Sequence, residues 1–119
     1  MKDFGRPSVE LVQQTDDTFT LSLNIASELP CLQGHFPNLP VVPGVAQLHW
    51  AVEFAASYLG VSNEVSALEV LKYQHVMQPD RSIQLSLRFD EKKSKLYFNY
   101  FDEDNKYSSG RVVLGAVDV

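Results

Sequence analysis

One segment of this 119-residue chain has the spacing of an amphipathic helix, and the rest of the chain must be arranged around it. It opens at Pro43-Gly44 and stops at Gly60. Proline suits a first turn, where its missing N–H would have no partner, and glycine suits the residue after the last turn. The apolar residues at helical spacing are Val45, Leu48, Val52, Ala55, Ala56 and Leu59. The pattern predicts one helix whose apolar stripe and small residues lie against another layer.

The remaining apolar residues follow the period of strands. In residues 19–25 and 83–89, apolar and polar side chains alternate, which is typical of a strand with one buried face. Residues 9–14, 66–77, 96–101 and 111–117 are further strand candidates, with turns at 15–17 and 102–105. We therefore expect an α+β fold, one domain over residues 1–119, in which a curved antiparallel sheet wraps around one central helix.

Composition excludes several classes of function. A net charge of −5 argues against a nucleic-acid surface, and no apolar run approaches the length that crosses a bilayer. The first residues lack a secretory signal, and a single cysteine cannot form an internal disulfide, so we expect a cytoplasmic protein. That cysteine, Cys31, is either an apolar filler or a thiol facing a pocket. The spacing of His35, His49 and His75 indicates no metal site, and no glycine loop indicates a nucleotide cofactor.

The most informative stretch covers residues 33–45. Three prolines and two glycines there fix an irregular backbone, since each proline locks its own φ and restricts the residue before it. The stretch ends at the start of the predicted helix, where the N–H groups of Gly44 and Val45 have no helical acceptor. These two groups are candidates to polarise a carbonyl oxygen.

The motifs Gly34-His35-Phe36-Pro37, Pro40-Val41 and Pro43-Gly44-Val45 resemble the signature of the β-hydroxyacyl-acyl-carrier-protein dehydratases. The resemblance extends from about residue 9 onward and implies a hotdog fold, a homodimer or higher even oligomer, and active sites at the subunit interface. By position, His35 would remove the α-proton of a 3-hydroxyacyl thioester. Gly44 or Val45 would hold the thioester carbonyl, with Phe36, Pro37 and Trp50 beside the substrate.

The sequence departs from this family at the helix. Where the family carries a Glu or Asp that faces the histidine of the other subunit, this chain has His49. We expect His49 to fall on the apolar stripe, either as a hydrogen-bonded core residue or as the proton donor, since imidazolium is a competent acid near neutrality. Glu53, one turn further on, either assists His49 or is a solvated helix residue. His75 is expected at the surface or a sheet edge.

The leading hypothesis is dehydration of 3-hydroxyacyl thioesters on an acyl carrier protein, in a fatty-acid or aryl-polyene type pathway. The segment Gln47-Leu48-His49-Trp50 is similar to the aryl-polyene dehydratases. The alternatives are a non-catalytic acyl-binding subunit and a hotdog thioesterase. An acidic carrier protein would need a basic patch, and the densest basic cluster, Lys92, Lys93 and Lys95, is also explained as a hairpin turn.

Overall fold

The structure is a computed structural model that describes residues 4–15, 17–32 and 41–115. It contains one α-helix, a single 3-10 turn and one antiparallel sheet within those ranges. In chain order the elements are β1 (Ser8–Gln14), β2 (Thr18–Asn24), η1 (Pro30–Leu32), α1 (Gly44–Leu59), β3 (Val65–Tyr73), β4 (Ser82–Asp90), β5 (Lys95–Phe101) and β6 (Lys106–Leu114).

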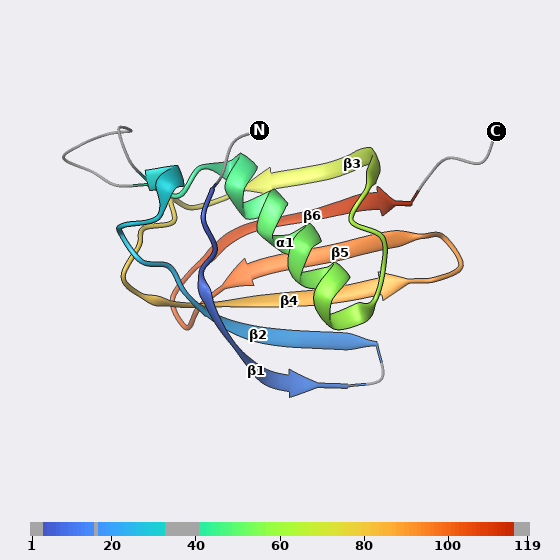
Figure 1. Ribbon diagram of the computed structural model, residues 1–119, viewed down its shortest axis with the longest axis horizontal. Helices are drawn as coiled ribbons and strands as arrows, with labels where there is room; N and C mark the ends of the chain where they lie inside the picture. Colours follow the sequence, from blue (N-terminus) through green and yellow to red (C-terminus); the bar gives the residue numbers. More distant parts are fainter. Residues whose placement is uncertain (1–3, 16, 33–40, 116–119) are drawn as a thin grey trace.

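The six strands form a single sheet in the order β1-β2-β4-β5-β6-β3, and every neighbouring pair is antiparallel. Helix α1 crosses one face of this sheet diagonally, and β1 and β3 form the two outer edges (Figure 1). The predicted α+β arrangement, a sheet around one helix, is therefore confirmed. No helix in the described part of the chain combines the length and apolar character needed to cross a membrane.

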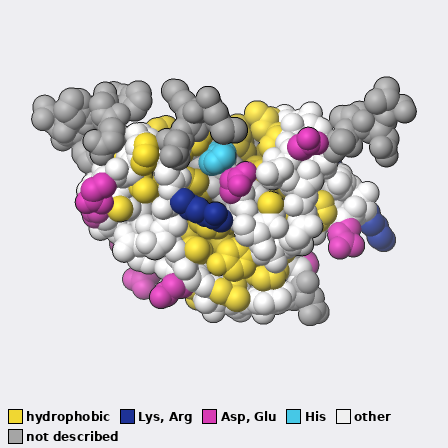
Figure 2. Space-filling model, in the orientation of Figure 1, with side chains coloured by type: hydrophobic (Ala, Val, Ile, Leu, Met, Phe, Trp, Pro, Cys, Tyr) yellow, Lys and Arg dark blue, Asp and Glu magenta, His cyan; other side chains and the backbone are white. Residues whose placement is uncertain are grey.

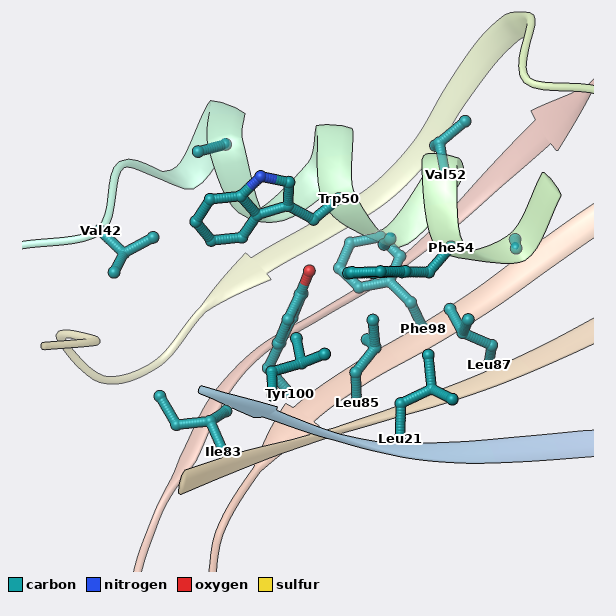
Figure 3. Packing of buried hydrophobic residues seen from close by; sticks show 14 of the residues in the cluster. Leu21, Val42, Trp50, Val52, Phe54, Ile83, Leu85, Leu87, Phe98 and Tyr100 are labelled. Atoms are coloured by element: carbon teal, nitrogen blue, oxygen red, sulfur yellow. The ribbon is translucent and has the colours of Figure 1, made fainter. Parts of the chain in front are cut away.

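The core lies between α1 and the sheet. Alternate residues of β2, β4 and β5 are buried, as the period-2 pattern predicts. Trp50 and Phe54 reach from the helix toward Phe98 and Tyr100 of the sheet (Figure 3). Cys31 is 6% exposed and belongs to this core cluster, so its thiol is a small apolar filler.

The predicted helix boundaries are confirmed. Helix α1 ends at Leu59, and Gly60 takes the left-handed conformation (φ 69°) that glycine adopts most readily at a helix end. Of the basic cluster, Lys92 and Lys93 lie in the turn between β4 and β5, where the Asp90 carboxylate accepts both backbone N–H groups, and Lys95 is the first residue of β5. The cluster therefore lies at the hairpin between these two strands.

The prediction of the last strand, at residues 111–117, is wrong at its start. Strand β6 begins at Lys106, five residues earlier, because the polar run from Lys106 to Gly110 pairs with β5 and β3. Gly110 is required there, since a Cβ at this position would lie 2.5 Å from the ring of Phe98. Gly110, which looks like a loop residue in the sequence, instead leaves room for the Phe98 ring of the neighbouring strand β5.

Candidate functional site

The amino end of α1 is built as the sequence predicts. Pro43 is extended (φ −61°, ψ 145°), and its carbonyl accepts the N–H groups of Ala46 and Gln47. Among the residues that the structure describes, the N–H groups of Gly44 and Val45 have no acceptor. Within the described ranges, the helix therefore presents two N–H donors without an acceptor at its positive end, where they favour a developing negative charge on an oxygen atom.

Hydroxyl groups of the sheet hold the first turn of α1 in place. Tyr73 Oη donates to the Gly44 carbonyl at 3.0 Å, and Tyr100 Oη donates to the Gln47 carbonyl at 2.6 Å. Burial raises the pKa of both tyrosines, most strongly for the fully buried Tyr100, so both hydroxyls stay protonated as donors. A Cβ at Gly44 would lie 2.6 Å from the outer end of the Tyr73 ring, so a larger residue there would have to displace this side chain.

A cavity of about 420 Å³ lies beside this end of the helix. Its lining includes Gly44, Gln47 and Tyr73, together with Val41, Val42 and residues 74–77. His75 belongs to this lining and is exposed two residues beyond the end of the edge strand β3, so it lies at the surface as expected. Its ring packs against Tyr107 with 5.7 Å between centroids, and its backbone N–H donates to the Tyr107 carbonyl.

The prediction that His49 lies on the buried stripe is wrong. His49 is exposed, and its ring packs against Phe4 with 5.2 Å between centroids. The buried face is centred on Ala46, Trp50 and Phe54, while Val45 is 58% exposed. Most of the helix circumference is apolar, so the apolar spacing alone does not select one face.

Three polar residues of the helix mark its outward face, although a fourth, Gln47, is buried. His49, Glu53 and Ser57 follow one another at intervals of four, which places them on one stripe. The chain segment before β1 runs beside this stripe: Phe4 contacts His49, and Arg6 donates to Ser57 Oγ at 3.4 Å and lies over the Phe54 ring. The sequence therefore contained a signal for the outward face, in its polar rather than its apolar positions.

His49 and Glu53 share a cavity of about 250 Å³ on this outer face. Its lining also contains Gly5, Arg6, Trp50 and Phe54. Figure 2 shows a histidine with an acidic and a basic side chain beside it over the helix. Trp50 is itself 2% exposed, and its indole N–H donates to the Gly5 carbonyl at 2.9 Å, so it anchors the chain before β1 to the core. The structure thus brings together His49, Trp50 and Glu53, and places Gly44 in the other cavity.

Three predicted site residues, His35, Phe36 and Pro37, lie outside the described residues. Sequence reasoning missed Arg6, Tyr73 and Tyr100, which contact the site from positions far along the chain. Within the described ranges, no group of three or more His, Cys, Asp or Glu side chains could hold a metal ion.

Comparison with known proteins gives consistent matches. The chain matches the family model described as ApeI-like, ApeI dehydratase, over residues 11–111. It is 32% identical over 75 residues to the 3-hydroxyacyl-[acyl-carrier-protein] dehydratase FabZ of Erythrobacter litoralis. These aligned residues make up 55% of this chain and 49% of that protein. The match thus spans about half the length of that relative.

Two solved structures match nearly the whole chain. One is a chain of the dehydratase heterocomplex ApeI:P from Xenorhabdus doucetiae, with a TM-score of 0.82 and 32% identity over 94% of this chain and 100% of that chain. The other is an uncharacterized protein from Erwinia carotovora, with a TM-score of 0.73 and 29% identity over 93% of this chain and 97% of that chain. The fold is therefore the predicted hotdog fold, and the chain belongs to the ApeI-like dehydratase family.

Proposed function

We propose that this protein dehydrates 3-hydroxyacyl thioesters, carried on an acyl carrier protein, to trans-2-enoyl thioesters. The observation that carries the proposal is the position of His49. The family's acid position holds an imidazole that is exposed at a cavity wall beside Glu53, and not a histidine buried for packing. Membership of the ApeI-like dehydratase family supports the class of reaction.

In the proposed mechanism, the His35 imidazole removes the α-proton of the substrate. Negative charge then develops on the thioester oxygen, where the N–H groups of Gly44 and Val45 stabilise it. The bond between C3 and its hydroxyl oxygen breaks, and the protonated His49 supplies the proton with which hydroxide leaves as water. The electron pair of the broken Cα–H bond, held as the enolate, forms the α–β double bond of the enoyl product as the hydroxyl group leaves.

We propose that each site is shared between two subunits. The edge strand β3 and the residues after it expose large apolar side chains, which a second copy would cover: Val65 (41% exposed), Leu68 (54%), Tyr73 (51%) and Val76 (53%). An exposed edge strand with such side chains pairs readily with another strand. His35 of one subunit would then face His49 of the other, as the resemblance implies.

We propose that the protein acts in the cytoplasm and that its reaction belongs to a fatty-acid or aryl-polyene type pathway. Phe36 and Pro37 would flank the substrate at the His35 loop. Trp50 would support the cavity from within the core, since its side chain is buried.

A second candidate function is a non-catalytic subunit that binds an acyl thioester. One observation favours it: the family carboxylate is replaced by His49. The similar chain from Xenorhabdus doucetiae comes from a heterocomplex, which makes a different partner chain the alternative to a second copy of this one.

One incubation distinguishes these functions. The purified protein is mixed with a 3-hydroxyacyl carrier protein, and the acyl carrier is followed by mass spectrometry, with His35→Ala as the matched control. The proposal requires the loss of one water from the substrate with the wild-type protein only. Release of free carrier protein would indicate a thioesterase, and complex formation without any mass change would indicate a binding subunit.

A further inference from the structure

Gln47 is an unusual residue for its place in the fold. It lies on the buried face of α1 and is 3% exposed. Among the residues that the structure describes, the buried polar residues are Gln47 and Ser108. A methionine or leucine would fill a similar volume on this face without needing hydrogen-bond partners. The amide must therefore contribute something other than packing.

The side-chain amide of Gln47 is bonded at both ends. Its Nε2 donates to the Val42 carbonyl at 3.2 Å, and its Oε1 accepts from Ser108 Oγ at 2.6 Å. Its backbone carbonyl accepts from Tyr100 Oη at 2.6 Å. Only an amide supplies a donor and an acceptor in this arrangement, because a carboxylate in its place would set an acceptor against the Val42 carbonyl. Gln47 thus joins the chain before the helix to both β5 and β6.

These bonds fix the direction in which the chain enters α1. The Val42 N–H donates to the Met77 carbonyl at 2.8 Å, so the backbone of Val42 is held on one side by Met77 and on the other by Gln47. Two residues later, the Gly44 carbonyl accepts from Tyr73, and the same peptide unit carries the N–H of Val45. The orientation of the N–H groups at Gly44 and Val45 therefore follows from the hydrogen bonds that Gln47, Tyr73 and Met77 make with this segment.

We infer that Gln47 is a positioning residue, whose amide bridge between Val42 and Ser108 aims the N–H groups of Gly44 and Val45 at the thioester oxygen. This inference rests on the function proposed above. An oxyanion donor acts only when it points to where charge develops, and loss of one such donor costs about 10²- to 10³-fold in kcat. Misdirection of the first turn should cost a part of that factor while substrate binding is largely kept.

The test compares Gln47→Met with the wild-type protein and with a stability control, Leu87→Ala. Leu87 is fully buried in β4 and lies away from the first turn of α1 (Figure 3), so its truncation destabilises the fold without touching the amide bridge. We expect Gln47→Met to lower kcat by about 10-fold or more with KM changed by less than about 2-fold. Leu87→Ala should lower the unfolding temperature while kcat per folded protein stays near wild type. Ser108→Ala, which removes one bond of the bridge, should change kcat in the same direction by less.

A spectroscopic measurement makes the inference independent of turnover. The C=O stretching band of a bound trans-2-enoyl thioester shifts to lower frequency when donors polarise the carbonyl. In Gln47→Met and in Ser108→Ala this band should move back toward its frequency in water. An unchanged band, or a kcat no lower than that of Leu87→Ala, would overturn the role of Gln47.

The two proposals fail in different ways. If the wild-type protein shifts the band but does not dehydrate the substrate, and Gln47→Met loses the shift, the positioning role stands and the enzymatic function falls. If the wild type turns over and Gln47→Met does so equally well, the enzymatic function stands and the positioning role of Gln47 falls. If the wild type neither polarises the carbonyl nor turns over, both are wrong.

Discussion

Helix α1 presents two faces of opposite chemistry to its surroundings. The face toward the sheet carries buried apolar side chains and one amide, and no buried side-chain N or O atom in the described part of the chain lacks a hydrogen-bond partner. The outer face carries His49 and Glu53, for which the described residues provide no ion pair. The inner face fixes the helix on the sheet, and under the proposed function the outer face offers its titratable groups to a substrate or a second subunit.

Truncation of His49 on the outer face should reduce activity more than any other change. His49→Ala should lower kcat/KM by about 10²- to 10⁴-fold, the range typical of losing a general acid. Its free energy of unfolding should change by no more than about 0.5 kcal/mol, because the side chain is exposed. Steady-state kinetics and urea unfolding measure the two quantities. His49→Glu, which restores the family carboxylate, should retain more activity than the alanine variant. Wild-type turnover by His49→Ala would show that the outer face takes no part in catalysis.

On the inner face, Trp50→Ala should act on stability first. We expect a loss of about 3–5 kcal/mol in the free energy of unfolding, because a large buried side chain and its bond to the Gly5 carbonyl are both removed. The matched control is Ser57→Ala on the outer stripe, which should cost no more than about 0.5 kcal/mol. Urea unfolding is measured at one protein concentration, since oligomerisation shifts apparent stability. A loss below about 1 kcal/mol for Trp50→Ala would contradict the anchoring role.

Glu53→Gln tests whether the outer residues act together. A helical pair at a spacing of four is worth about 0.2–0.5 kcal/mol, so we expect kcat/KM to fall by about 2-fold if Glu53 orients His49. The pH dependence of kcat/KM is measured for the wild-type protein and for Glu53→Gln. Unchanged kinetics and an unchanged profile would make Glu53 a solvated helix residue.

The smallest effect is expected on the far face of the sheet, where charges are paired. Glu69 accepts from Lys95 Nζ at 3.0 Å and from Arg111 Nε at 2.8 Å, and these bonds, first that of Lys95, hold the pKa of the Glu69 carboxyl below its ordinary value. A folded-state pKa below the unfolded one stabilises the fold above the unfolded value and loses that contribution as the pH falls through the folded value.

In Glu69→Gln the thermal midpoint should therefore fall less between neutral pH and about pH 3 than in the wild type, with kcat unchanged. Thermal unfolding across that range is the measurement. An identical pH dependence in the two proteins would show that this pairing contributes nothing to stability.

Sequence patterns predicted the elements of the fold because their periods report burial directly. The start and stop of α1 followed from Pro43 and Gly60, and the central strands from simple alternation. The start of β6 could not be predicted in this way, because the need for glycine at 110 arises from a ring on the neighbouring strand. Pairing between strands decides such positions, and a single sequence does not reveal it.

The candidate site was predictable only in part, for a similar reason. The free donors at Gly44 and Val45 follow from the local rule for helix ends, which needs no tertiary information. The outward direction of His49 depends on the rotation of the helix about its own axis against the sheet. The buried aromatic side chains of Trp50 and Phe54 determine this rotation. The contacts of Tyr73 and Tyr100 with the first turn join residues far apart along the chain.

In the proposed dimer, the outer face of α1 in one subunit completes a site begun by His35 of the other. Co-expression of His35→Ala with His49→Ala probes this sharing, since random pairing into dimers would create one intact site in each mixed dimer. We predict that neither variant alone dehydrates the substrate and that the mixture recovers about a quarter of wild-type turnover. A mixture as inactive as its two components, although mixed dimers are present, would contradict the claim.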